Sequence, residues 1–191
     1  AAGLTKTGAG TALLNGAATY SGTTTVADGV LRLGGHDRLA TTGTLVVSGG
    51  VLDLGGFGQT LAGVQQTGGV VANGTLTSLA PFDLQAGTVD AVLAGTAGLT
   101  KTGAGTVLLN GVATYTGTTS VADGTLLLGG HDRLATTGTL VVSGGLLDLG
   151  GFGQTLAGVQ QTGGTIAHGT LTSLGTFDLQ AGTVDAVLAG D

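Results

Sequence analysis

Short apolar runs recur along the chain at intervals of about 18 to 21 residues, and each run follows a glycine. Two residues after each of these glycines the side chain is apolar, at Ala12, Leu31, Leu52, Val71, Val89, Val107, Leu126, Leu147, Ile166 and Val184. The next position is often charged, as at Arg32, Asp53 and Asp90. Because side chains alternate between the two faces of a strand, this pattern predicts short β-strands with one buried face.

Each interval is too short for a strand, a helix and a second parallel strand, which together need about 30 residues. It suits three short strands joined by tight turns, and the further strand candidates are residues 23–26, 44–47 and 60–64. Turns are expected at Asp28-Gly29, Gly34-Gly35, Gly49-Gly50, Gly55-Gly56 and Asn73-Gly74. We therefore predict an all-β fold, a right-handed parallel β-helix (solenoid) with about ten coils of roughly 19 residues and vertical ladders of buried side chains.

The two halves of the chain repeat each other. Aligning Leu4 with Leu99 brings the remainder into register at an offset of about 95 residues, with about 13 differences and no insertion. We predict one continuous solenoid made of two near-identical units, residues 1–95 and 96–191. Such fidelity favours recent duplication within an array, so the chain is expected to be a fragment of a longer series.

Composition excludes several classes of protein. The 41 glycines come with one proline and no Gly-X-Y period, so the chain is not collagen. The hydrophobic fraction of 41% is too high for a disordered linker. No apolar run reaches the about 18 residues of a membrane helix, so no membrane insertion by this segment is expected. A net charge of −6 disfavours nucleic acid as a partner, and the lack of cysteine fits an exported protein.

Residues 4–35, LTKTGAGTALLNGAATYSGTTTVADGVLRLGG, return at 99–130 as LTKTGAGTVLLNGVATYTGTTSVADGTLLLGG. The segment closely resembles the passenger-associated transport repeat of bacterial autotransporter proteins, because its Gly, Lys, Tyr and Leu residues fall at the spacing of that motif. The resemblance implies a right-handed β-helical passenger domain that is exported through the outer membrane of a Gram-negative bacterium, to the cell surface or the extracellular space. It also implies a role in secretion and stalk formation rather than in chemistry.

The sequence offers few candidates for a catalytic or ligand site. The turn Gly34-Gly35-His36-Asp37-Arg38, repeated at 129–133, is either a metal or carbohydrate contact or a solvated turn in which Asp caps nearby backbone N–H groups. We favour the turn, because one His and one Asp per unit are too few for a metal shell. A triad built from Ser48 and His36 has no geometric support in the sequence.

Asp28, Asp53 and Asp90 raise the question of calcium, but the tandem Gly-Gly-x-Gly-x-Asp arrays of calcium-binding solenoids are absent from the sequence. Turn positions and outward-facing positions explain these aspartates. Enzymes built on β-helices need carboxylates clustered on neighbouring coils, and the sequence shows no such cluster. We therefore predict no catalytic, cofactor-binding or metal-binding residue, and no cofactor.

Other polar positions have structural interpretations. Arg32 and Asp53 are expected to face outward on successive coils as a surface ion pair, which Leu127 removes in the second unit. Asn73 and His168 interrupt an apolar ladder and are interpreted as local turns toward solvent. None of these positions is expected to bind a ligand.

The expected function is a structural stalk or spacer of a surface-displayed autotransporter passenger, of adhesin or biofilm type, that aids secretion and folding outside the cell. The alternative is a self-assembling extracellular filament built from the same repeats, and an enzyme is not expected. The expected partners are neighbouring repeat units of the parent chain; self-association and a host or cell-surface ligand stay open. A stalk should be monomeric when purified, whereas a filament protein should polymerise end to end.

Overall fold

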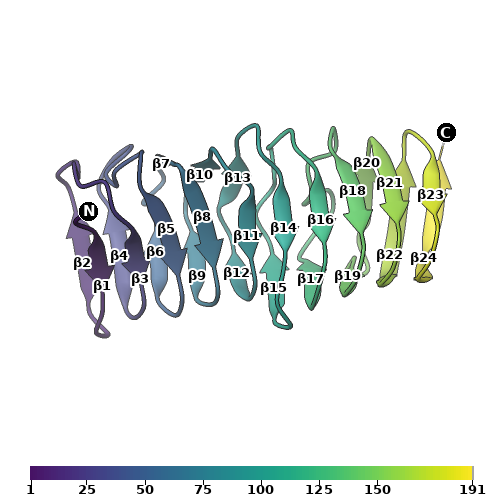
Figure 1. Cartoon of the computed structure of the whole chain (residues 1–191), viewed down its shortest axis with the longest axis horizontal. Coiled ribbons are helices and arrows are strands. Elements are labelled where there is room, and N and C mark those ends of the chain that lie inside the picture. Colours follow the sequence, from purple (N-terminus) through teal and green to yellow (C-terminus); the bar gives the residue numbers. More distant parts are fainter. Residues whose placement is uncertain (191) are drawn as a thin grey trace.

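The computed structural model describes residues 1–190 and shows a rod of parallel strands in ten successive coils (Figure 1). Each coil passes from a strand of a first sheet, through a turn, to a strand of a second sheet, and returns over a third face. Residues 1–190 contain no helix long and apolar enough to cross a membrane. The prediction of an all-β parallel solenoid with about ten coils is confirmed.

The first sheet takes one strand from every coil and extends along the whole rod. Its strands are β1 (Leu4–Lys6), β3 (Thr24–Val26), β5 (Thr44–Val47), β8 (Gly63–Gln66), β11 (Phe82–Leu84), β14 (Leu99–Lys101), β16 (Thr119–Val121), β18 (Thr139–Val142), β21 (Gly158–Gln161) and β23 (Phe177–Leu179). Register is kept from coil to coil, as between Leu4, Thr24 and Leu45. Each coil is therefore hydrogen-bonded to the next along one continuous face.

The second sheet also follows the whole rod. Its strands are β2 (Thr11–Leu14), β4 (Val30–Leu33), β6 (Val51–Asp53), β9 (Val70–Ala72), β12 (Gly87–Val89), β15 (Thr106–Leu109), β17 (Thr125–Leu128), β19 (Leu146–Asp148), β22 (Thr165–Ser173) and β24 (Thr183–Gly190). The last two are long because they bend around a corner, where their pairing shifts between Ala167 and Thr170. Their final residues belong to the third face.

The third face carries strands in only some of the coils. In the first half of the chain these are β7 (Gly58–Leu61), β10 (Thr75–Ser78) and β13 (Val92–Ala94). In the second half β20 (Gly153–Leu156) pairs with the end of β22, which pairs with the end of β24. The other coils cross this face as loops, and one of them makes a single bridge between Leu93 and Ala113.

The prediction of one strand at residues 60–64 is wrong. Strand β7 ends at Leu61 and β8 begins at Gly63 in a different sheet, so the chain turns a corner at Ala62. Leu61 and Val64 are both buried although they are three residues apart. Within one straight strand such residues would face opposite sides, and the corner is what allows both to point inward.

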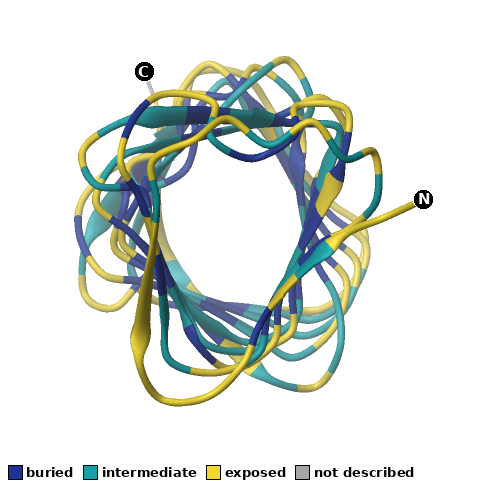
Figure 2. Cartoon of the chain, turned by 90° about the vertical axis from the view of Figure 1, so that its left-hand side faces the viewer, coloured by how far each residue is buried: buried dark blue, intermediate teal, exposed yellow. Residues whose placement is uncertain are grey.

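Apolar side chains fill the inside of the coils. In the end-on view the coils stack around one common axis, and the buried stretches of the ribbon are dark blue (Figure 2). The predicted inward positions from Leu31 to Ile166 are all buried, whereas Ala12 in the first coil is exposed and Val184 in the last is partly exposed. In the structure each of these two coils has a neighbour on one side only. A ladder position is therefore buried by contact with coils on both sides.

The pairing register of the second sheet shifts by two residues where the second half of the chain begins. In the first sheet Leu84 pairs with Lys101, but in the second sheet Val89 pairs with Leu109 rather than with Val107. The path from Lys101 to Leu109 is three residues longer than the path from Leu84 to Val89. The additional residues form a wider turn around the Lys101 side chain, and the regular glycine spacing does not reveal this offset.

Candidate functional site

A lysine occupies an inward position at the end of the strand that opens each half of the chain. Lys6 ends β1 and Lys101 ends β14. Alternation within β14 directs Lys101 to the same side as Leu99, which is also buried. Lys101 is fully buried, and Lys6 keeps 8% of its surface exposed. Lysine is almost never fully buried without partners, so these two positions need a compensating contact.

Three backbone carbonyls surround the ammonium group of Lys101. Its Nζ donates to Thr102 O at 2.7 Å, to Gly103 O at 2.6 Å and to Asp123 O at 3.0 Å. The first two carbonyls belong to the turn that follows β14, whereas the third belongs to the next coil. The equivalent contacts of Lys6 are to Thr7 O, Gly8 O and Asp28 O, at 3.0, 2.5 and 3.0 Å. We call each of these arrangements a lysine cradle.

The cradle of Lys101 depends on a glycine at position 124. Gly124 has φ of +62°, and Asp123 Oδ1 accepts a hydrogen bond from its N–H at 2.7 Å. A Cβ atom at this position would lie 2.6 Å from Lys101 Nζ and 2.3 Å from Gly103 O. Burial lowers the pKa of Lys101, while the charges of Asp123 and Asp83 act in the opposite direction.

The tyrosine of the repeated segment is a second buried polar side chain. Tyr115 is fully buried, its hydroxyl lies 2.6 Å from Thr119 Oγ1, and its ring centroid lies 6.3 Å from that of Phe82. Burial raises the pKa of Tyr115 to about 12, although the hydrogen bond with Thr119 acts the other way. Lys101 and Tyr115 are thus both held inside the coils.

Residues 4–33 and 99–128, which contain both lysine cradles, match the family model of the passenger-associated-transport-repeat. We call these two segments the first and second transport repeats, after the family model that they match. The chain is also similar to the adhesin BmaC autotransporter of Brucella suis biovar 1 (strain 1330), with 42% identity over 85 residues. That alignment covers 43% of this chain and 2% of the relative, so the chain spans a very small part of that protein's length. No solved structure matches the chain.

These matches confirm the resemblance of the transport repeats to autotransporter passengers. The motif's lysine and tyrosine positions are filled at Lys6 and Tyr20 in the first transport repeat, and at Lys101 and Tyr115 in the second. In the structure these side chains contact backbone or hydroxyl groups of their own repeat. The transport repeat is therefore a pair of coils with polar contacts built into its interior.

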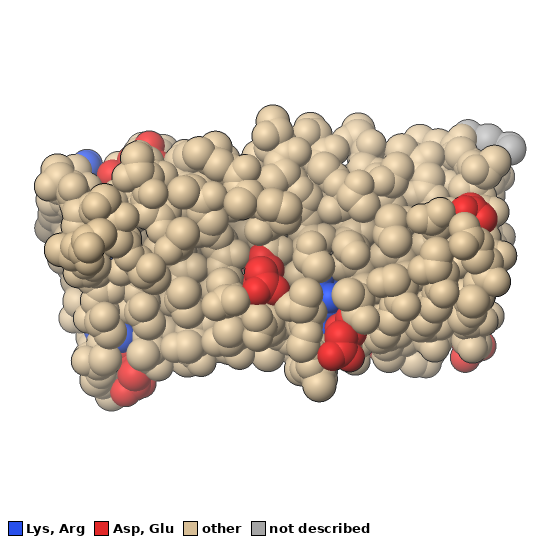
Figure 3. All heavy atoms as spheres, in the orientation of Figure 1, with Lys and Arg blue, Asp and Glu red and all other residues tan. Residues whose placement is uncertain are grey.

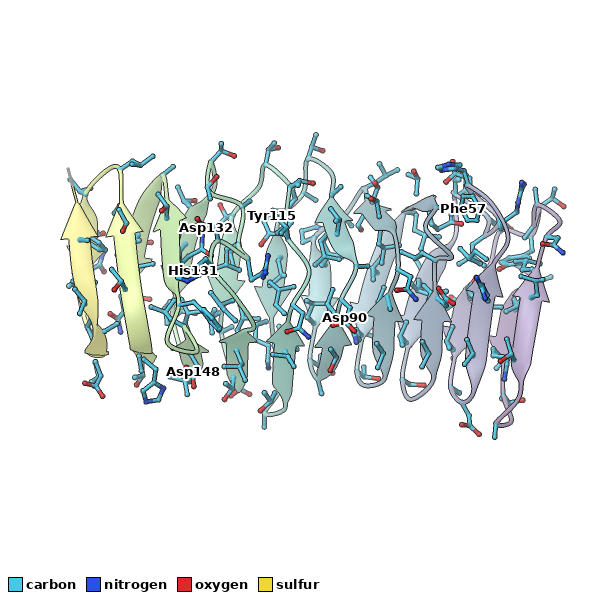
Figure 4. The ribbon with its side chains drawn as sticks, turned by 180° about the vertical axis from the view of Figure 1, so that it is seen from behind. Phe57, Asp90, Tyr115, His131, Asp132 and Asp148 are labelled. Atoms are coloured by element: carbon cyan, nitrogen blue, oxygen red, sulfur yellow. The ribbon has the colours of Figure 1, made fainter. Side chains whose placement is uncertain are left out.

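The turn at residues 129–133, just after the second transport repeat, contacts the following coil. His131 Nδ1 accepts a hydrogen bond from Gly153 N at 2.9 Å, and Asp132 Oδ1 accepts one from Thr155 N at 2.8 Å (Figure 4). The interpretation that this Asp caps nearby N–H groups is wrong, because it binds β20 one coil later. Both side chains are exposed, as expected of a turn. The first half repeats these contacts, from His36 to Gly58 and from Asp37 to Thr60.

The predicted pair of Arg32 and Asp53 forms on the outer side of the second sheet. The two residues are paired in register on β4 and β6, and Arg32 Nε lies 3.5 Å from Asp53 Oδ2. The Arg32 side chain is 57% exposed, so solvent screens the pair. In the second transport repeat Leu127 replaces the arginine and pairs in register with Asp148. The ion pair is thus a local surface feature.

The interpretation of Asn73 and His168 as turns toward solvent is confirmed. Both residues are exposed and adopt positive φ, of 59° and 58°. Asn73 Nδ2 donates to Asp53 Oδ1 at 3.1 Å, and His168 Nδ1 lies 3.1 Å from Asp148 Oδ1. Each turn is therefore tied to an aspartate on the preceding coil.

The residues weighed for catalysis or calcium are dispersed in the structure. Ser48 follows β5 at the corner between the first and second sheets, whereas His36 lies in the loop after β4, at a different corner. Asp28 Oδ1 accepts from Gly29 N at 2.7 Å, and Asp90 Oδ1 accepts from a side-chain amide at 2.7 Å. Across residues 1–190, no three His, Cys, Asp or Glu side chains gather in a group that could hold a metal ion.

Asp83 is the most highly coordinated carboxylate on the first sheet. Thr102 Oγ1 donates to its Oδ1 at 2.5 Å, and the amides of Gln65 and Gln85 donate to its Oδ2 at 2.8 and 3.0 Å. Burial raises the pKa of Asp83, but the hydrogen bonds from Gln65, Thr102 and Gln85 outweigh it and hold that pKa below its usual value. The three donors satisfy the carboxylate, which makes it a structural contact.

Sequence reasoning missed the buried polar side chains. Four glutamines are buried, namely Gln59, Gln66, Gln154 and Gln161. Gln66 Nε2 donates to Gly69 O and to Thr88 O, both at 3.1 Å. The signal for it is the alternation itself, because Gln66 lies two residues after buried Val64 and so faces the same side.

Proposed function

We propose that this chain is part of the structural stalk of a secreted, surface-displayed autotransporter passenger. The observation that carries the proposal is the first sheet, which is continuous through all ten coils, including both transport repeats. Hydrogen bonds along one unbroken face make each coil a rigid extension of the last. The similarity to an adhesin autotransporter supports the same setting.

In this proposal the protein lies at the surface of a Gram-negative bacterium, in a passenger of adhesin or biofilm type, and its role is mechanical rather than enzymatic. Charged side chains form a few small, scattered groups on the face shown in Figure 3, which is otherwise uncharged. A surface of this kind exerts little electrostatic attraction on charged partners. It suits a spacer that holds other parts of a passenger away from the cell.

The proposed stalk also helps the chain to fold outside the cell. Apart from its own strands, each coil makes its contacts with the coils before and after it, and one coil alone buries too little apolar surface to be stable. A folded coil offers its strand edges and apolar ladder to the next segment of chain. Folding can therefore proceed coil by coil as the polypeptide emerges.

Removing one whole period from the parent protein tests the stalk. Deletion of residues 4–98 joins equivalent positions and removes five coils, about 24 Å of rod at about 4.8 Å per coil. We expect the passenger to stay displayed with its outer end closer to the cell by that length, measured by electron microscopy. A deletion of residues 4–88 is the control, because it breaks the coil phase and should impair display. Unchanged reach after the in-phase deletion would contradict the proposal.

The alternative is a self-assembling filament, which would form through the strand edges of the first and last coils. Leu13 and Val187 expose 57% and 63% of their surfaces there, beside strands that pair on one side. Such edges can join end to end. Size-exclusion chromatography with light scattering separates the two functions. The substitutions Leu13→Lys and Val187→Lys place charges on the two end coils, and a stalk segment that contains them should be monomeric. Polymers that survive both substitutions would favour the filament.

A further inference from the structure

We propose that each transport repeat contains a lysine latch, a carbonyl site for a primary ammonium group that is filled only when the next coil has docked. The site around Lys101 consists of two carbonyls from its own turn and the carbonyl of Asp123 from the next coil. This inference goes beyond the stalk function, because the latch would operate in any protein that contains this pair of coils.

The chemistry of the site selects a cation with three N–H donors. An ammonium group has three donors and no acceptor, and Lys101 uses one for each carbonyl. Among residues 1–190 neither lysine forms an ion pair with a carboxylate, so carbonyl dipoles replace the hydration of the charge. Burial of an ammonium without such partners is strongly unfavourable.

This requirement couples the lysine to the docking of the following coil. Before β16 and β17 pack on β14 and β15, the Asp123 carbonyl is absent and the ammonium keeps water as its third partner. Docking brings Asp123 O to Nζ, and the amides of Ala122 and Asp123 then donate to Lys101 O. Lys101 thus contacts the next coil twice, because its side chain donates a hydrogen bond to that coil and its backbone carbonyl accepts hydrogen bonds from it.

The same chain contains a matched joint without a lysine. One coil later, Val121 stands in register with Lys101, and the amides of Ser143 and Gly144 donate to Val121 O. The backbone contacts of the two joints are alike, but the inward side chain is apolar. A comparison of these joints therefore separates the latch from ordinary stacking.

Acylation of amines tests the latch in the unaltered chain. Lys6 and Lys101 are the only lysines, so a small acylating reagent has two side-chain targets besides the N-terminal amine. We expect Lys101 in the folded chain to react at least about a hundredfold more slowly than in the chain unfolded by guanidinium, because its exposure requires opening of the joint. Reaction of Lys101 at a similar rate in both states would overturn the proposal.

Hydrogen exchange in Lys101→Ala tests the ligand class of the site. We expect the amides of Ala122 and Asp123 to exchange about tenfold faster or more, while those of Ser143 and Gly144 change less than about twofold. Methylammonium, which can enter the vacant site and donate hydrogen bonds, should restore slow exchange. Tetramethylammonium at the same ionic strength has no N–H donor and should not. Equal effects of the two salts, or equal changes at both joints, would overturn the latch and leave the stalk proposal standing.

Gly124→Ala provides a second variant that keeps the lysine. Its Cβ would lie 2.6 Å from Nζ, and we expect it to open the cradle and expose Lys101 to acylation. Gly145→Ala is the matched control, since Gly145 has a similar φ of +60° and also meets backbone of the preceding coil, but no lysine. The proposal fails if both variants leave Lys101 equally protected.

Discussion

The side chain of Gln59 forms two hydrogen bonds with the main chain of Leu39, one coil earlier. Leu39 N donates to Gln59 Oε1 at 2.8 Å, and Gln59 Nε2 donates to Leu39 O at 3.1 Å. The coil of Leu39 crosses the third face as a loop, so no strand is present there to pair with β7. The glutamine amide takes the place of a peptide group, and Gln154 does the same for Leu134.

Replacing Gln59 by leucine should destabilise the protein, even though an apolar side chain usually suits a buried position. The substitution leaves the N–H and the C=O of Leu39 without partners, and each unsatisfied buried group costs about 1–3 kcal/mol. We expect a loss of at least about 2 kcal/mol in the free energy of unfolding, measured by urea denaturation. Gln180→Leu, at an exposed position, is the control and should change it by less than about 0.5 kcal/mol. Equal stability of Gln59→Leu and the parent would show that water satisfies Leu39.

Much of the fold follows from local alternation. The phase of Leu31, Leu52 and Val71 is visible in the sequence, because apolar and polar residues alternate there and the glycines mark the turns. The corner at Ala62 is not visible, because only a single glycine, Gly63, follows it and no pair of turn residues marks it. The longer turn after Lys101 could not be predicted for a different reason. The spacing between glycines gives the number of residues in a coil but not which residues pair between coils.

The interior of the transport repeat was less predictable than its fold. Lys101 has the correct phase to face inward, but a charged residue is expected on the surface unless its partners are known. Those partners are backbone carbonyls, and because every residue has one, the sequence does not show which of them contact the lysine. The contacts of Asp37 and Gln59 lie about 20 residues away in sequence, so they depend on the stacking of coils.

Arg32→Leu should have little effect on stability. The pair with Asp53 is mostly solvated, so we expect a loss well under 1 kcal/mol in chemical denaturation. The second transport repeat supplies the reverse experiment, because Leu127→Arg places a guanidinium in register with Asp148. It should gain no more than Arg32→Leu loses. A loss above about 2 kcal/mol for Arg32→Leu would mean that the pair is a major stabilising contact.

Gly16 and Gly111 occupy the same position in the two transport repeats, and alanine should act differently at each. A Cβ at Gly111 would lie 1.9 Å from Ala91 O of the preceding coil, whereas nothing lies within 4 Å of a Cβ at Gly16. We expect Gly111→Ala to lose about 1–3 kcal/mol through overpacking, and Gly16→Ala to be neutral or slightly stabilising. Thermal unfolding of the two variants provides the comparison. Equal losses would show that backbone conformation, rather than the neighbouring coil, requires glycine here.

Tyr115 makes the stability of the chain sensitive to alkaline pH. Burial raises its pKa to about 12 in the folded state, whereas a tyrosine in an unfolded chain has a pKa of about 10. The unfolded state therefore loses its proton first as the pH rises. The stabilisation due to the neutral phenol is complete below about pH 10 and is lost between pH 10 and 12, up to about 2.7 kcal/mol.

Tyr115→Phe removes this dependence because phenylalanine cannot ionise. Near pH 7 we expect the variant to be less stable by about 1 kcal/mol, since it lacks the hydrogen bond with Thr119. Above about pH 10 the difference should shrink and then reverse, because only the parent is destabilised by ionisation in the unfolded state. Urea unfolding of both proteins from pH 8 to 11.5 measures it. All other ionisable groups are common to both proteins, so a difference that stays constant over this range would show that burial does not perturb the Tyr115 phenol.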